Sequence, residues 1–86
     1  MASEGKLNPY IEMRFLRILK EGRMNISHLQ QKANVNPKMF KKYVIHLGNS
    51  HYIEISVEGR FKKVIITDKG IRRLNQLENI LNADPK

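Results

Sequence analysis

The sequence predicts an α+β domain in which three helices precede a β-hairpin and a further helix follows it. Asn-Pro pairs at Asn8-Pro9 and Asn36-Pro37 each come directly before an apolar pattern of helical period. Such a pair supplies an N-cap and then the residue best suited to the first helical position. Residues 52–57 instead alternate between polar and apolar side chains, as in a half-buried strand. A chain of 86 residues has room for one small domain with a single core.

The charge balance favours a polyanionic partner. Sixteen Lys and Arg against eight Asp and Glu give a formal net charge of +8. Between residues 38 and 73 there are nine basic residues and three acidic ones, so most of the excess charge is concentrated there. A basic region of this kind is typical of proteins that bind nucleic acid.

Other function classes have little support in the sequence. There is no cysteine, and His28, His46 and His51 lack the compact spacing of metal ligands, so no metal site is expected. No glycine-rich phosphate loop, nucleophile motif or paired-carboxylate pattern indicates an enzyme. We therefore expect no catalytic residue, no cofactor and no small-molecule ligand. Without a long apolar run or a signal-peptide pattern, the chain is expected to be cytoplasmic and to have no membrane partner.

The first helix is expected from Pro9 to about Glu21, where a glycine stops it. Residues 1–7 before it are expected to form a disordered tail. One face of this helix is apolar and consists of Ile11, Phe15, Ile18 and Leu19. Met13 and Leu16 lie off that face, which gives the helix more apolar perimeter than a monomer needs.

A short edge strand at Met24 and a helix over residues 26–33 come next, followed by a helix from Pro37 to about Leu47. In this third helix, residues at helical spacing are expected to face the core: Met39, Tyr43, Val44 and Leu47. The outward positions hold Lys38, Lys41, Lys42 and Ile45. The position of Phe40 assigns it to neither face.

The three lysines lie in the N-terminal half of the third helix, where the helix dipole favours acidic residues instead. Their placement is locally unfavourable, and it is explained if an external polyanion lies in front of the helix. A helix that points its N-terminal half into a DNA groove is the commonest such arrangement. Asn36 has two open interpretations, because it either caps the helix N–H groups or contacts DNA.

The hairpin is expected to turn at Glu58-Gly59 and to return over residues 60–67. With a two-residue loop, Val57 would pair with Arg60. Basic side chains then gather at the tip: Arg60, Lys62 and Lys63. A hairpin with a basic tip is typical of an arm, and Arg60 is the best candidate for insertion into a minor groove.

The last helix is expected over residues 69–82, capped by Thr67 or Asp68, with residues 83–86 as a frayed tail. Its apolar residues cover about half of its circumference and are Ile71, Leu74, Leu77, Ile80 and Leu81. This excess, like that of the first helix, indicates a second copy of the chain as partner. Arg73 is expected either to reach DNA or to pair with Asp68 or Glu78.

The order of elements resembles the winged-helix DNA-binding superfamily. It is most similar to the small basic winged-helix chromosomal proteins and transcriptional regulators of archaea. The resemblance covers residues 8–82, and it rests on these segments: Ala33-Asn34-Val35-Asn36, Tyr43-Val44 with Leu47, Tyr52-Ile53, and Ile66-Thr67-Asp68-Lys69-Gly70 before Leu74 and Leu77.

The resemblance implies a winged helix-turn-helix with a three-helix core, a β-hairpin wing and a C-terminal helix. It also implies a third helix in the major groove, a wing along the backbone or minor groove, and dimerisation through the terminal helix. By position, Lys38, Lys41 and Lys42 match the groove-facing part, and Arg60 and Lys62 match the wing. The last helix is shorter here than in those relatives, which favours a compact helix-pair dimer over a long coiled coil.

Together these features predict a homodimer that binds double-stranded DNA, as a transcriptional regulator or a nucleoid-associated chromosomal protein. The residues expected to contact DNA are Asn36, Lys38, Lys41, Lys42, Arg60, Lys62 and Lys63. The expected dimer interface consists of Met13, Leu16, Leu77, Ile80 and Leu81. Lysines without arginine or glutamine on the third helix favour phosphate-dominated contacts over base reading. The alternatives are an interaction module that docks on an acidic protein surface and, with less support, an RNA-binding domain.

Overall fold

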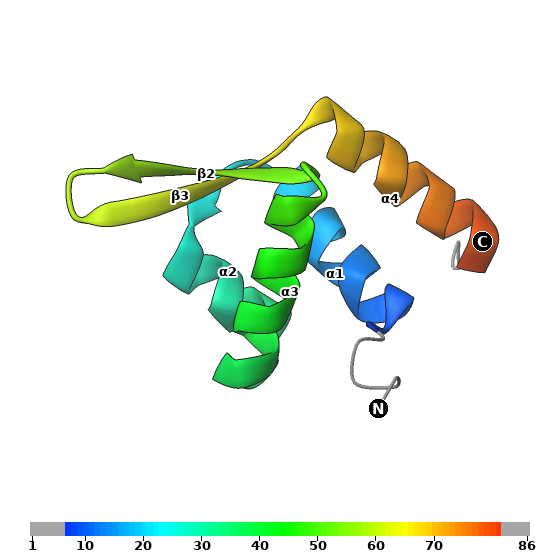
Figure 1. The fold of residues 1–86 in the computed structure, drawn as a ribbon, viewed down its shortest axis with the longest axis horizontal. Coiled ribbons are helices and arrows are strands. Elements are labelled where there is room, and N and C mark those ends of the chain that lie inside the picture. Colours follow the sequence, from blue (N-terminus) through cyan, green and yellow to red (C-terminus); the bar gives the residue numbers. More distant parts are fainter. Residues whose placement is uncertain (1–6, 82–86) are drawn as a thin grey trace.

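Four helices and a three-stranded sheet form the structure, a computed structural model that describes residues 7–81. The order is α1 (Pro9–Lys20), β1 (Met24–Asn25), α2 (Ile26–Ala33), α3 (Pro37–Asn49), β2 (Ile53–Glu58), β3 (Phe61–Ile66) and α4 (Asp68–Leu81). This confirms the predicted α+β architecture of a three-helix core, a hairpin and a further helix (Figure 1). The two expected terminal tails fall almost entirely on residues 1–6 and 82–86, outside the described residues, whereas Leu7 packs against the core. No helix within residues 7–81 is long and apolar enough to span a bilayer.

The Asn-Pro pairs start α1 and α3 as predicted. The Asn8 side chain accepts a hydrogen bond from the backbone N–H of Tyr10 at 2.8 Å, and that of Asn36 accepts one from Met39 at the same distance. Each cap satisfies one N–H group that the first helical turn leaves without a partner. At the start of α4 the same role falls to Thr67, whose hydroxyl accepts from the Gly70 N–H at 3.0 Å.

The sheet has the strand order β1-β3-β2, and both pairings are antiparallel. The predicted hairpin exists, but its turn is one residue later than expected. Glu58 pairs with Phe61 and Val57 with Lys62, so the two loop residues are Gly59 and Arg60. Gly59 has a φ of +63°, and glycine at the first loop position tolerates that left-handed conformation without steric cost.

The core is built around Phe15 of α1, which has no exposed surface. Its ring stacks on Phe40 and on Tyr43 of α3, with ring centroids 5.6 Å apart in both cases. Phe40, which the sequence assigned to neither face, is therefore a core residue. The hydroxyl of Tyr43 also accepts a hydrogen bond from the backbone N–H of Asn8 at 2.7 Å, which holds the start of α1 against α3.

The structure corrects the expected faces of α1 and α4. Met13, Leu16 and Leu77 are all at most 4% exposed, so none of them lies on the surface of the single chain. The reason is visible in Figure 1, where α1 lies between α4 on one side and α2 and α3 on the other. A helix buried on two sides needs two apolar faces, and α4 of the same chain covers the second one.

Candidate nucleic-acid interface

The exposed side of α3 is basic. Phe40, Tyr43, Val44 and Leu47 anchor this helix in the core, and the opposite side carries Lys38, Lys41, Lys42 and Ile45, all exposed. No acidic residue occupies the first turn of α3. The positive end of the helix dipole and the lysine charges therefore add up on one surface, which we call the α3 face (Lys38, Lys41, Lys42, Ile45).

Asn36 borders the α3 face, and its side-chain oxygen caps the helix. The structure thus confirms the first of the two interpretations that the sequence left open. The capping bond holds the side-chain oxygen of Asn36 at the helix end. Asn36 contributes to the site mainly by fixing where α3 begins.

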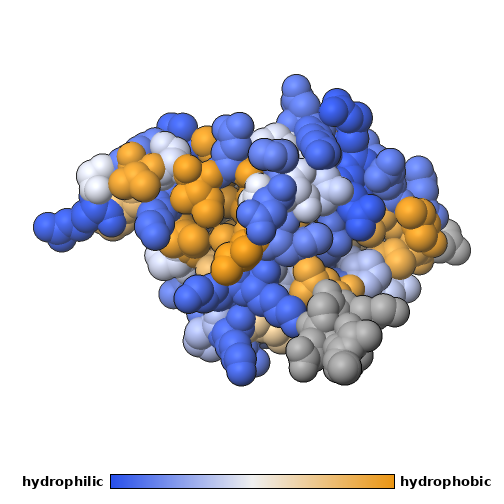
Figure 2. Space-filling model, viewed as in Figure 1, coloured by the Kyte–Doolittle hydropathy of each residue, from blue (hydrophilic) through white to orange (hydrophobic). Residues whose placement is uncertain are grey.

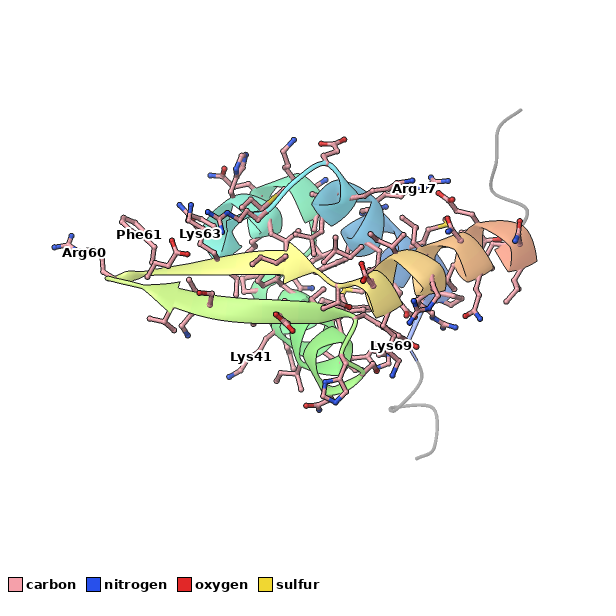
Figure 3. The ribbon with its side chains drawn as sticks, turned by 90° about the horizontal axis from the view of Figure 1, so that it is seen from above. Arg17, Lys41, Arg60, Phe61, Lys63 and Lys69 are labelled. Carbon is pink, nitrogen blue, oxygen red and sulfur yellow. The ribbon has the colours of Figure 1, made fainter. Side chains whose placement is uncertain are left out.

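The β2–β3 hairpin protrudes from the helical body as a wing (Figure 1). Arg60 sits in its two-residue turn and points away from the body at the tip (Figure 3). Lys62 is exposed and pairs with Val57, whereas Lys63 is half-buried and pairs with Ser56. Neighbouring residues of a strand point to opposite faces of a sheet, so the wing carries a cation on each face and a third at its tip.

The predicted DNA contacts do not all gather on one surface. In Figure 3, Lys41 lies on one side of the hairpin, Lys63 lies on the other, and Arg60 extends beyond both. Lys63 therefore lies on the opposite side of the hairpin from Lys41. The α3 lysines and Arg60 at the wing tip form the main candidate interface. Lys63 belongs to a separate surface of the wing.

The wing also exposes apolar side chains close to these basic residues. The sequence analysis did not assign them to the DNA interface. Ile55 and Val57 on β2 are 43% and 69% exposed, and Phe61 on β3 is 55% exposed. Figure 2 shows hydrophobic atoms gathered over the wing and beside α3. Alternation over residues 52–57 predicts one apolar face of β2, but only Ile53 of that face is buried, because the wing extends past the helical body.

A second basic cluster lies at the start of α4. A shallow hollow of about 250 Å³ is lined by Tyr52, Lys69, Arg72, Arg73 and Gln76. The Lys69 Nζ atom lies 5.6 Å from the Tyr52 ring centroid, within the range of a cation–π contact. The Arg73 guanidinium also lies over the Tyr52 ring, 5.8 Å from its centroid. It hydrogen-bonds with Glu12, which raises the pKa of Arg73. Lys69 and Arg72 are left as the exposed cations of this cluster.

Comparison with known proteins bears on this site. A family model described as winged helix-turn-helix matches residues 8–84. Among solved structures, the DNA-binding protein Sso10a-2 from the archaeon Sulfolobus solfataricus superposes with a TM-score of 0.79. It is 23% identical over 90% of this chain and 80% of its own. AF1382 from the archaeon Archaeoglobus fulgidus has a TM-score of 0.71 and 18% identity over 100% of this chain and 99% of its own.

A third similar structure is Sco3205, a MarR-family transcriptional regulator from Streptomyces coelicolor that was solved in complex with DNA. Its TM-score is 0.72 and its identity 18%, over 81% of this chain and 48% of its own. This chain therefore spans about half the length of that regulator. No curated protein matches the sequence. At these identities the solved structures establish a shared fold.

Proposed function

Because this chain belongs to the winged helix-turn-helix family, we propose that it binds double-stranded DNA through α3 and the wing. The observation that carries the proposal is the α3 face, a helix surface with three lysines and no acid in its first turn. It lies beside a wing whose tip is Arg60 (Figure 3). Concentrated positive charge on a protruding helix and hairpin is the complement of a DNA groove with phosphates on both sides.

In this proposal the lysines mainly contact phosphates. Their ammonium groups are point charges on flexible stems, which suits the backbone better than bidentate contacts with base edges. The backbone amides that begin α2, which receive no side-chain cap from Asn25, add further phosphate ligands. Such a site grips DNA with modest sequence preference, as expected for a chromosomal protein or a regulator that acts at many sites.

The proposal is tested by duplex binding as a function of salt. Each phosphate contact that is lost lowers the slope of log K against log salt by about 1. The double variant Lys38→Gln with Lys41→Gln is therefore expected to bind more weakly, with a slope reduced by about 2. A matched control, Lys20→Gln with Arg23→Gln, removes the same charge from exposed residues at and after the end of α1. That segment lies opposite Lys41 in Figure 3.

Comparing the two double variants shows whether the position of the lysines on α3 or only the net charge of the protein determines duplex affinity. Equal losses in both would mean that only the overall charge matters, and would contradict the assignment to α3. An absence of duplex binding at low salt would overturn the proposal as a whole.

We also propose that the chain acts as a homodimer through the exposed end of α4. Ile80 is 72% exposed, the most exposed large apolar side chain in residues 7–81, and Leu81 beside it is half-buried. Met13, Leu16 and Leu77 are buried in the core of the single chain. Of the predicted interface residues, Ile80 and Leu81 therefore remain to contact a second copy. Light scattering is expected to show a dimer that Ile80→Asp dissociates. A wild-type monomer at high micromolar concentration would remove this part of the proposal.

One observation favours the alternative of a protein-interaction module. Val57 and Phe61 expose apolar surface near the wing tip, and exposed apolar groups among charges also occur in protein interfaces. In that case the wing would bind an acidic protein surface, and duplex DNA would not compete for it. Failure to bind duplex in the salt series, together with retained folding, would favour this alternative.

A further inference from the structure

Ile45 is an apolar residue in the middle of the basic α3 face. It follows Lys38 by seven residues and Lys41 by four. At about 100° per residue, the three lysines and Ile45 fall within an arc of about 100°, with Ile45 between the rows of Lys41 and Lys42. Ile45 is 51% exposed, so about half of its surface is accessible to a molecule that binds the α3 face.

The core gives no reason for an isoleucine at this position. Phe40, Tyr43, Val44 and Leu47 already anchor α3, and Ile45 lies on the other side of the helix. A β-branched residue also has a lower helix propensity than the straight-chain residues beside it. Because Val and Ile are held in one main rotamer in a helix, the exposed surface of Ile45 is rigid. It differs in this respect from the flexible lysines around it.

We propose that Ile45 contacts the C5-methyl groups of thymine in the major groove and is the specificity-determining residue of α3. The inference rests on the proposed duplex binding and goes beyond it. When flanking lysines reach outward to phosphates on both sides of a groove, the residue between them lies over the base edges. The thymine methyl is the apolar group that the four base pairs present there. The α3 face therefore favours A·T-containing duplex.

The surrounding charges favour DNA over a protein as the occupant of this face. Lys38, Lys41 and Lys42 lie within two turns of Ile45, and an apolar protein partner would have to desolvate them. In a DNA groove their ammonium groups remain at the phosphates, next to water, while only the isoleucine is covered. Because Lys38, Lys41, Lys42 and Ile45 include no arginine, asparagine or glutamine, the methyl contact is the main source of base preference among these four residues.

The test replaces thymine by uracil, which removes only the methyl group. Binding is measured for an alternating A·T duplex and for the same duplex with deoxyuridine in place of thymidine. Burial of one methyl group is worth about a fourfold change in affinity, so the wild-type protein is expected to bind the thymine duplex at least about fourfold more tightly. An alternating G·C duplex with C5-methylated cytosine is likewise expected to bind more tightly than the same duplex without the methyl groups.

Three variants assign the effect. Ile45→Ala is expected to fold, since alanine favours an exposed helix, and to bind thymine and uracil duplexes equally. Lys41→Gln is expected to weaken binding to both duplexes and to keep their ratio, because phosphates are the same in each. Tyr10→Ala removes an exposed side chain of α1 that belongs to neither the α3 face nor the proposed dimer contact, and it is expected to keep the ratio as well.

Failures of this inference and of the proposed function are distinguishable. Equal wild-type affinity for thymine and uracil duplexes would overturn the role of Ile45 while leaving duplex binding in place. A thymine preference that persists in Ile45→Ala would overturn the assignment to this residue, since uracil substitution also alters duplex shape. No affinity for any duplex at low salt would overturn both.

Discussion

Arg73 of α4 forms a two-point contact with Glu12 of α1, 61 residues earlier in the chain. Its Nε donates to Oε2 of Glu12 at 2.9 Å, and its Nη2 donates to Oε1 at 3.3 Å. The Glu12 side chain is only 4% exposed, against 29% for Arg73. The contact raises the pKa of Arg73, mainly through the hydrogen bond with Glu12. A carboxylate so deeply buried depends on this partner.

The two halves of this ion pair are expected to differ in importance. Among the described residues, Arg73→Ala leaves the buried Glu12 carboxylate with His46, 3.8 Å away, as its remaining basic partner. The expected loss in the free energy of unfolding is about 3 kcal/mol. Glu12→Gln leaves Arg73 partly in water, and the expected loss is about 1 kcal/mol. Urea denaturation measures both. The exposed pair Arg17–Glu78 serves as control, with a loss below about 1 kcal/mol for Arg17→Ala.

Equal losses for Arg73→Ala and Glu12→Gln would contradict the claim that burial of the carboxylate dominates. The stabilisation joins α1 to α4 and so fixes the helix that leads out of the wing. No change in the position of α3 is expected from either variant. Duplex affinity per folded molecule is therefore expected to stay within about twofold of the wild-type value, since neither group lies on the α3 face.

Gly70 of α4 lies close against Tyr52, in the segment before β2. A Cβ at this position would overlap the backbone carbonyl oxygen of Tyr52 and lie 2.8 Å from Cγ1 of Ile66. That carbonyl already accepts a hydrogen bond from the Thr67 N–H at 3.0 Å, so it has no freedom to move aside. Gly70→Ala is therefore expected to destabilise the fold by about 3 kcal/mol. Thermal denaturation followed by circular dichroism measures this.

Gly48 provides the matched control, because it is also a glycine in a helix. A Cβ there meets no described atom within 4 Å. Gly48→Ala is expected to stabilise the chain by up to about 1 kcal/mol, through the higher helix propensity of alanine. A similar loss in both variants would show that glycine flexibility, and not the contact with Tyr52, matters at residue 70.

Much of the fold follows from local signals in the sequence. The Asn-Pro pairs predict where α1 and α3 begin, because cap and first-turn chemistry depends only on adjacent residues. Both Asn8 and Asn36 make the expected capping bonds. Alternation over residues 52–57 likewise predicts β2, since strand periodicity is a local property.

The errors concern features that depend on distant parts of the chain. The hairpin turn lies one residue later than expected, so Val57 pairs with Lys62 two positions beyond Arg60. Either Glu58-Gly59 or Gly59-Arg60 satisfies the turn chemistry locally, and only the observed register pairs Ile55 with Val64. Met13 and Leu16 are buried within the single chain, and the buried Glu12 forms an ion pair with Arg73. No periodic pattern within α1 indicates a partner 61 residues away.

Asn36 is expected to affect stability and not base recognition. Asn36→Ala removes the cap on the Met39 N–H, and the expected loss is about 1 kcal/mol of unfolding free energy. Asn8→Ala removes the equivalent cap of α1 and is expected to cost about the same. Duplex affinity measured well below the melting temperature is expected to be similar in the two variants. A selective loss of affinity in Asn36→Ala would instead support direct contact with DNA.

Arg60 at the wing tip is expected to act in the minor groove, where a planar guanidinium is favoured in narrow A·T tracts. Arg60→Gln removes a charge from an exposed turn residue, so stability is expected to be unchanged while affinity for an A-tract duplex falls about tenfold. Arg60→Lys keeps the charge and the salt slope, yet is expected to lose most of the preference for A-tract over G·C-rich duplex, because ammonium is more strongly hydrated. Lys62→Gln is the control and is expected to weaken binding to both duplexes alike. If Arg60→Lys keeps the wild-type preference, the wing tip contacts phosphates only.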